Sequence, residues 1–154
     1  MKRVVFLTIC TAVLLTGCQF ETSTSKGISI EKSEVARIDE NNQIVPASDK
    51  TFMRGEDVHY ILYNVGKFKE GEDGLHWLEM DLQVTDQDDN IILDAKEMLG
   101  ENGHIKLEGG YAATPYGTFE TTEKLEPGKY RIKITIFDKV GNGKATVSST
   151  FVLE

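Results

Sequence analysis

One segment near the carboxyl end of the chain constrains its fold more than any other. In the run KYRIKITIFD, positions 129–138, every second residue from Tyr130 to Ile136 is apolar and the residues between them are polar. A period of two with several β-branched residues is typical of a β-strand that buries one face. The chain must therefore supply a second apolar layer to cover that face.

Other runs can provide this layer. GNG at 141–143 follows shortly after, and KATVSSTFVLE at 144–154 then places Ala145, Val147, Phe151 and Leu153 on one face. Gly and Asn accept the positive backbone angles of tight turns, so the two runs predict a β-hairpin. LHWLEMDLQVTD at 75–86 also alternates. DVHYILYNV at 57–65 is apolar on both faces, as expected for a central strand.

The remaining segments favour strands over helices. Shorter strand candidates are GISIEKSEVARI at 27–38, KTFMRG at 50–55 and NIILDA at 90–95. No segment carries a sustained helical stripe, and KEMLGENG at 96–103 could supply a single helical turn at most. Short strands separated by turn residues predict an all-β chain, an antiparallel immunoglobulin-like β-sandwich of about seven strands.

A short motif sharpens this prediction. LEPGKY, positions 125–130, has a Pro-Gly turn that leads directly into Tyr130 at the start of a strong strand. It resembles the tyrosine corner of immunoglobulin-like and fibronectin-type sandwiches, in which a tyrosine at the start of the penultimate strand bonds its hydroxyl to nearby backbone. The buried cysteine pair of immunoglobulin domains is absent here, as it is in fibronectin-type members.

The first 18 residues carry a different kind of signal. Two basic residues at positions 2–3 precede an apolar stretch, Val4–Leu15. The stretch is too short to span a bilayer as a helix, and it has the length of a signal-peptide core. It closes with Leu15-Thr16-Gly17-Cys18, which resembles the lipobox of bacterial lipoproteins.

That resemblance implies a lipid anchor. The Cys18 thiol would carry diacylglycerol with palmitate-type chains, and a peptidase would cut between Gly17 and Cys18. Residues 1–17 are then the signal peptide, 18–27 the lipidated cysteine with a flexible tether, and 28–154 the β-sandwich domain. The alternatives are an ordinary secretory signal with an incidental cysteine, or a weak transmembrane anchor.

Charge and cysteine content narrow the functional classes. The chain has 25 acidic and 17 basic residues, a formal net charge of −8. This excess argues against nucleic acid as a partner, because nucleic-acid binders carry basic patches.

The lipoprotein signal would account for both cysteines of the chain. Cys10 would leave with the signal peptide and lipid would be attached to Cys18. The mature domain would then have no thiol for a disulfide, a metal site or a nucleophile.

The histidines do not form a recognisable metal motif. His59, His76 and His104 lie in separate segments, without the spacing that lets one strand or helix present two imidazoles to a metal. His76 lies on the apolar face of its strand, where a hydrogen-bonded ring is favoured over a ligand. We therefore predict no cofactor.

A calcium site has partial support in the sequence. Counted from Asp86, Asp88 is position three, Asn90 is position five and Glu97 is position twelve of an EF-hand-like loop. Position six is Ile91, where such loops need glycine for a sharp turn, and no flanking helices are evident. A polar hairpin turn over DQDDN is the favoured interpretation.

Two surfaces remain as candidates for function. Glu79 and Asp81 share the presumed outer face of their strand with Trp77, where they could grip a sugar or act as an acid and a base. A solvated face is the favoured interpretation. The long stretch Leu107–Phe119 carries Tyr111 and Tyr116, whose rings give contact area at low entropic cost. It could be a binding loop or an ordinary crossover between sheets.

The sequence thus predicts a lipid-anchored protein of the bacterial cell envelope, on the extracytoplasmic side of a membrane. Its domain would be a non-catalytic module that binds or assembles with an envelope protein or a glycan, with Trp77, Tyr111 and Tyr116 as candidate contacts. The alternatives are an inhibitor or accessory subunit of an envelope hydrolase and, least favoured, an enzyme acting on glycans. Gln19 is not the aspartate of inner-membrane retention signals, so outer-membrane placement follows if the organism has one.

Overall fold

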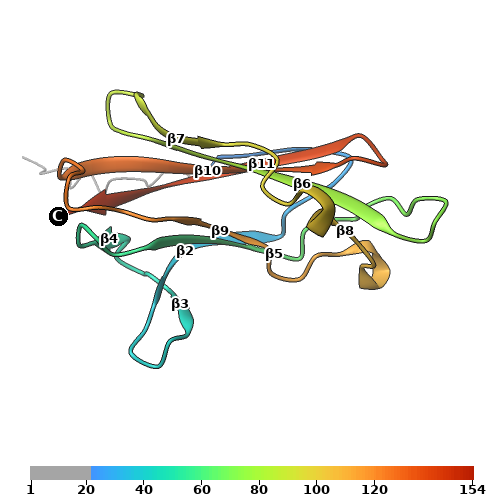
Figure 1. The fold of residues 1–154 in the computed structure, drawn as a ribbon, viewed down its shortest axis with the longest axis horizontal. Coiled ribbons are helices and arrows are strands. Elements are labelled where there is room, and N and C mark those ends of the chain that lie inside the picture. Colours follow the sequence, from blue (N-terminus) through green and yellow to red (C-terminus); the bar gives the residue numbers. More distant parts are fainter. Residues whose placement is uncertain (1–21) are drawn as a thin grey trace, which may run out of the picture.

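A computed structural model of the chain describes residues 22–154. Two β-sheets pack face to face in this part of the chain (Figure 1). The predicted signal peptide and the predicted lipidation and cleavage residues, Gly17 and Cys18, lie outside the described residues. Within residues 22–154 no helix has both the length and the apolar character needed to cross a membrane.

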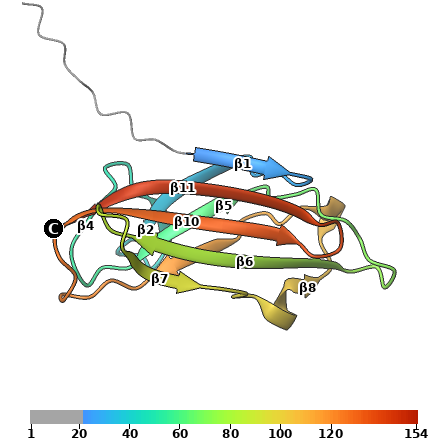
Figure 2. The same ribbon diagram turned by 90° about the horizontal axis from the view of Figure 1, so that it is seen from above.

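The larger sheet has seven strands. Its main path runs in the order β1-β11-β10-β6-β7, with β4 beside β11 and β8 beside β6 (Figure 2). The pairings are antiparallel except for the short pairing of β4 with β11. The bounds are β1 Thr22–Lys26, β4 Thr51–Phe52, β6 His76–Thr85, β7 Ile91–Ala95, β8 His104–Ile105, β10 Gly128–Asp138 and β11 Gly143–Leu153.

The smaller sheet has four antiparallel strands in the order β3-β2-β5-β9. Its strands are β2 Lys32–Ile38, β3 Ile44–Pro46, β5 Val58–Tyr63 and β9 Tyr116–Phe119. Two short 3-10 helices, η1 Gly100–Gly103 and η2 Glu108–Gly110, lie on the path from β7 to β9. The β2–β3 hairpin projects away from the sandwich (Figure 1).

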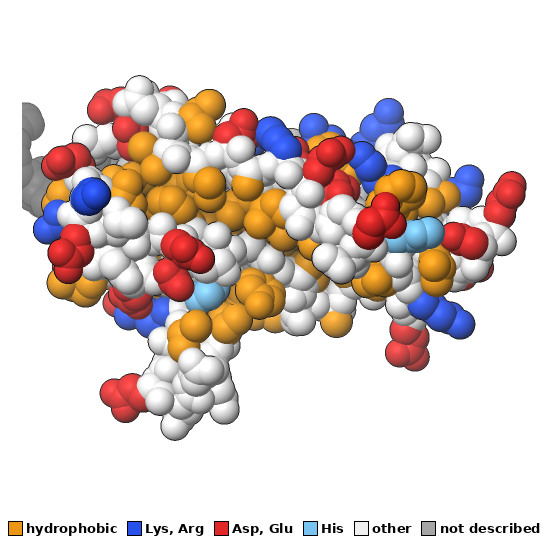
Figure 3. All heavy atoms as spheres, in the orientation of Figure 1, with side chains coloured by type: hydrophobic (Ala, Val, Ile, Leu, Met, Phe, Trp, Pro, Cys, Tyr) orange, Lys and Arg blue, Asp and Glu red, His pale blue; other side chains and the backbone are white. Residues whose placement is uncertain are grey.

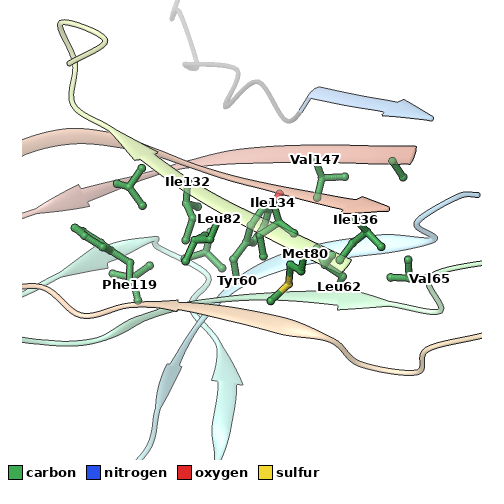
Figure 4. Packing of buried hydrophobic residues seen from close by; sticks show 14 of the residues in the cluster. Tyr60, Leu62, Val65, Met80, Leu82, Phe119, Ile132, Ile134, Ile136 and Val147 are labelled. Atoms are coloured by element: carbon green, nitrogen blue, oxygen red, sulfur yellow. The ribbon is translucent and has the colours of Figure 1, made fainter. Parts of the chain in front are cut away.

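The core lies between the sheets. Figure 4 shows apolar side chains of β6 and β10 pointing toward those of β5. The contributors with no more than 3% exposure include Met80, Leu82, Ile132, Ile134, Ile136, Tyr60 and Leu62. These residues occupy alternate positions of their strands, so the period of two in the sequence directly sets which side chains form the core.

The predicted all-β antiparallel sandwich is confirmed, although the strand number differs. The described residues form eleven strands instead of about seven. The additional ones include β3, β4 and β8, each of two or three residues, which are too short to leave a periodic pattern. The hairpin of β10 and β11 and the single helical turn near position 100 are found where they are predicted.

The tether prediction differs from the structure over residues 22–26. These residues form β1, which pairs with β11 from Thr22 opposite Ser148 to Lys26 opposite Lys144. The side chains of residues 23–26 are exposed. Main-chain hydrogen bonds alone attach such a strand to a sheet edge, so no apolar pattern was needed to form it.

The predicted tyrosine corner is present. The Tyr130 hydroxyl donates a hydrogen bond of 2.7 Å to the carbonyl oxygen of Glu126. Tyr130 is buried, its ring stacks on Phe151 with centroids 5.6 Å apart, and burial raises its pKa. The corner therefore fixes the turn before β10 to the aromatic core.

Candidate functional site

A hollow of about 590 Å³ opens at the end of the sandwich that holds the β10–β11 turn. We call it the end hollow. Its walls come from residues 67–70 of the β5–β6 connection, from the segment around η2 and from the β10–β11 turn, with His76 of β6 beside them. Three segments far apart in sequence thus meet here (Figure 1).

Asp138 holds two of these walls together. Its Oδ1 accepts hydrogen bonds from the backbone N–H groups of Val140, at 3.1 Å, and Gly141, at 2.8 Å. Its Oδ2 accepts the Lys69 N–H at 3.0 Å. A Cβ on Gly141 would collide with this carboxylate. The buried acid is thus fully engaged in positioning the β5–β6 connection against the turn.

His76 is the buried polar group of the end hollow. The side chain is 3% exposed, and its Nδ1 accepts the Leu107 N–H at 3.2 Å. Because the amide must be the donor, Nδ1 carries no proton in this bond and the neutral ring carries its proton on Nε2. Within residues 22–154 no hydrogen-bond partner is found for Nε2. The Nε2–H group is therefore a donor that faces the hollow.

The rim of the end hollow carries charges that have no ion partner. Lys67, Lys69 and Glu70 are exposed, and none of them is in an ion pair with another residue of the described part. Elsewhere Lys96 and Lys139 pair with nearby acids. The two lysines therefore place two cations that are free of ion pairs on the rim of one hollow.

An aromatic stack lies at the same end of the molecule. Trp77, 38% exposed on the outer face of β6, stacks on the His104 ring with centroids 5.4 Å apart. His104 Nε2 lies 2.9 Å from Asp73 Oδ2, and the Leu75 N–H together with His104 lowers the pKa of Asp73. The indole is thus held by a fixed neighbour while one face remains available for contact.

The structure separates the two candidate tyrosines. Tyr111, 45% exposed, follows η2, and its ring lies directly against Gly66 beside the end hollow. Tyr116, 50% exposed, begins β9 and lies opposite Ile61 on the outer face of the four-stranded sheet. Leu107–Phe119 is therefore a crossover that ends in an edge strand, and Trp77 and Tyr116 belong to opposite faces of the sandwich.

The three histidines stay apart. His59 is 4% exposed, and its Nδ1 lies 2.9 Å from Thr118 Oγ1, while burial lowers its pKa. His76 and His104 have the separate partners described above. In the described part of the chain, no three His, Cys, Asp or Glu side chains are arranged to hold a metal ion.

The calcium candidates are not brought together. Asp86 Oδ1 accepts the N–H groups of Asp88 and Asn90, each at 2.9 Å, and its Oδ2 accepts the Asn90 side chain. Glu97 lies beyond the far end of β7, where its N–H binds Asp81 and its carboxylate lies 3.4 Å from Lys139 Nζ. Residues 86–90 form the turn between β6 and β7, as the hairpin interpretation predicts.

The prediction of a solvated face at Glu79 is wrong. Glu79 is 3% exposed, and its carboxylate accepts the N–H groups of Met80, Leu99 and Gly100 at 2.8 to 3.0 Å. The segment after β7 folds back over β6 and covers it. Asp81 binds the Glu97 N–H and lies 3.5 Å from Lys96 Nζ. Both acids are thus engaged in structure, which the strand period could not show.

Sequence reasoning also missed several residues of the end hollow. Asp138 was placed only as the last residue of a strand, and Lys67 and Lys69 lie in a connection without any periodic pattern. The signal that could have found part of the site is the Gly-Gly pair at 109–110. Glycine pairs often mark places where backbone segments approach closely.

These features define a β-sandwich domain with an end hollow and an exposed aromatic surface. No protein-family model matches the chain, and no curated protein matches its sequence. Among solved structures it is similar to the C-terminal domain of Wzt, with a TM-score of 0.56, 9% identity, and coverage of 90% of this chain and 79% of that one. At this identity the similarity establishes the sandwich fold.

Two further solved structures overlap with the chain more loosely. A Niemann-Pick type C2 protein from the Japanese carpenter ant has a TM-score of 0.44 and 10% identity, covering 82% of this chain and 98% of that one. The PmoD soluble domain from Methylocystis sp. ATCC 49242 (Rockwell) has a TM-score of 0.38 and 10% identity, covering 79% and 90%. Neither carries weight in the functional assignment.

Proposed function

We propose that the protein is a lipid-anchored lipoprotein of the bacterial cell envelope whose sandwich is a non-catalytic binding module. Its binding surface is the end hollow together with Trp77 and Tyr111. The observation that carries this proposal is His76, a buried residue whose Nε2–H donor lines the hollow and has no partner among the described residues. A donor that faces a hollow from an otherwise buried side chain can fix the orientation of a ligand seated there.

The exposed aromatics support the same surface. Trp77 and Tyr111 are both more than one third exposed, and Tyr111 lies at the edge of the end hollow. Aromatic side chains supply large contact areas at low entropic cost, and they are enriched at binding hot spots. A partner protein or glycan seated on this end would cover both rings and the hollow together.

The position of β1 is compatible with presentation of this end from a membrane. A lipid on Cys18 would be four residues from Thr22, which limits its distance to about 14 Å. Thr22 pairs with Ser148 in the middle of β11. The β10–β11 turn lies five residues further along β11, or about 17 Å away. The turn beside the end hollow is therefore further from Thr22 than the extended tether can reach.

The anchor is tested by Cys18→Ser. Two acyl chains contribute about 0.8 kcal/mol per buried methylene, which is enough for stable attachment. We expect the wild-type protein to sediment with membranes and to incorporate labelled palmitate, and the variant to do neither. A variant that still sediments with vesicles, or a wild-type protein that takes up no palmitate, would contradict the anchor.

The binding surface is tested with the lipidated protein purified from envelope membranes. We expect bound material, identified by mass spectrometry, to be lost from the Trp77→Ala, Tyr111→Ala double variant. Tyr116→Ala is the matched control, because it removes an equally exposed ring from the opposite face. Loss of the bound material in the control, or its retention in the double variant, would contradict this placement.

The alternatives receive less support. A wedge-like inhibitor built on the Tyr111–Phe119 segment would need a protruding loop, whereas residues 116–119 form an edge strand. An enzyme using Glu79 and Asp81 would need a free acid, whereas Glu79 accepts three backbone N–H groups. An assembly role could instead use the apolar band that Figure 3 shows along one side of the molecule.

A further inference from the structure

We infer that the end hollow binds an oxyanion group, a phosphate or a carboxylate, with the His76 Nε2–H as the donor that faces the hollow and Lys67 and Lys69 as rim cations. This inference rests on the proposed binding function of the same surface and specifies the chemistry of its ligand. The charges and hydrogen bonds of the hollow carry it.

The state of His76 decides which ligand atom the hollow can accept. A metal ion at Nε2 would need that nitrogen without a proton, which in turn would require Nδ1 to be a donor. Here Nδ1 accepts the Leu107 N–H, so Nε2 keeps the proton. The ligand must therefore present a hydrogen-bond acceptor, and a metal ion is excluded at this nitrogen while the Leu107 bond persists.

The formal charges of the lining balance, with two lysines and two acids, so it is the hydrogen-bond donors that favour an anion among acceptors. Asp138 is buried, and its carboxylate already accepts three backbone N–H groups. Glu70 is the remaining acid of the lining, against the two lysines and the His76 donor. A neutral sugar would bring as many donors as acceptors, whereas an oxyanion brings acceptors alone and matches this excess of donors.

Gly110 keeps the donor accessible. Its φ is +83°, and a Cβ there would lie 2.9 Å from the Phe68 carbonyl oxygen and 3.6 Å from His76 Nε2. Any larger residue would be strained and would crowd the donor. The hollow is thus shaped by a residue that has no side chain at the point where the ligand must approach.

The test is a titration of the full-length protein in neutral detergent micelles, followed by two-dimensional NMR of the glycine amides. Inorganic phosphate and acetate are the two ligands, and glucose is the neutral comparison. We expect saturable shifts at Gly109, Gly110 and Gly141 with phosphate or acetate, and at least tenfold weaker effects with glucose. The anion that binds with the higher affinity shows whether the hollow prefers a phosphate or a carboxylate group.

Variants at His76 separate the donor from the fold. His76→Asn keeps an acceptor near Nδ1 for the Leu107 N–H but has no donor at the Nε2 position, so we expect at least tenfold weaker anion binding. His76→Gln places a donor near Nε2 and should bind better than His76→Asn. The spectra of both variants away from the hollow show whether each protein is folded.

Variants of the rim complete the experiment. Lys67→Gln with Lys69→Gln should weaken anion binding at least tenfold, whereas Lys129→Gln, an exposed lysine at the opposite end, should leave it unchanged. Equal binding by His76→Asn and wild type, the absence of saturable shifts, or equal binding of glucose would overturn the inference. The proposed function would survive such a result if the wild-type protein still captured its partner from envelope membranes. Loss of that captured partner in the Trp77→Ala, Tyr111→Ala double variant would still support the proposed function.

Discussion

The two ends of the sandwich are built in opposite ways. At the end holding the chain's carboxyl terminus, Phe52, Phe119, Tyr130 and Phe151 pack around one another with ring centroids 5.6 to 6.2 Å apart. At the other end, glycines, charged residues and one buried histidine surround the end hollow. Aromatic packing closes the first end, whereas the second keeps polar groups available. This contrast indicates that the aromatic end stabilises the fold, whereas the end with the hollow is the one that binds. We call them the closed end and the open end.

The largest expected effect lies at the closed end. Phe151 is 1% exposed and contacts three other aromatic rings. Phe151→Ala should lower the free energy of unfolding by about 3–5 kcal/mol, because it leaves a cavity where large aromatic contacts were. Urea unfolding measures this value. A loss below about 1 kcal/mol would mean that the closed end does not carry the stability we assign to it.

A smaller effect is expected for the tyrosine corner. Tyr130→Phe removes the hydrogen bond to the Glu126 carbonyl oxygen and keeps the ring. We expect a loss of about 1 kcal/mol in the free energy of unfolding, the usual net contribution of one hydrogen bond. Thermal unfolding monitored by circular dichroism gives the number, and an unchanged midpoint would show that the corner is not stabilising.

At the open end, we expect a substitution to change ligand binding more than it changes the free energy of unfolding. His76→Asn retains an acceptor for the Leu107 N–H, so we expect the free energy of unfolding to fall by less than about 1 kcal/mol. The same substitution should nevertheless weaken binding at the hollow. If it destabilised the protein as much as Phe151→Ala, the histidine would be a core residue and the division between the two ends would fail.

The smallest expected effect concerns pH and the β6–β7 turn. Hydrogen bonds from Asn90 and Asp88 hold the pKa of Asp86 below its ordinary value. A lowered pKa means that the charged turn stabilises the fold above pH about 4 and loses this contribution as pH falls through the folded-state pKa. Carboxyl NMR titration should show the lowered midpoint, and Asp86→Asn should reduce the pH dependence of stability in that range. An ordinary midpoint would contradict the hydrogen bonds.

The closed end could be predicted from the sequence, and most of the open end could not. Regular alternation marked β6, β10 and β11, and LEPGKY marked the corner, because both are local patterns. The end hollow depends on long-range contacts, such as Asp138 with Lys69, that no local pattern records. Glu79 shows the same difficulty, since a segment twenty residues later in the chain covers it.

Of the candidate contact residues, the sequence located the exposed rings but not their arrangement. The outer face of a predicted strand indicated Trp77, and the long segment Leu107–Phe119 indicated Tyr111 and Tyr116. The structure places the first two at the open end and Tyr116 on the other face. Which sheet a crossover segment joins is decided by strand pairing over long distances, so side-chain type alone could not separate them.

The most direct test of the central claim is photo-crosslinking in intact cells. A benzoylphenylalanine replaces Tyr111 at the open end in one strain and Tyr116 on the opposite face in another. We predict a discrete crosslinked product from position 111 and none from position 116. A product from position 116 alone, or from neither position, would contradict the claim that the open end is the binding surface.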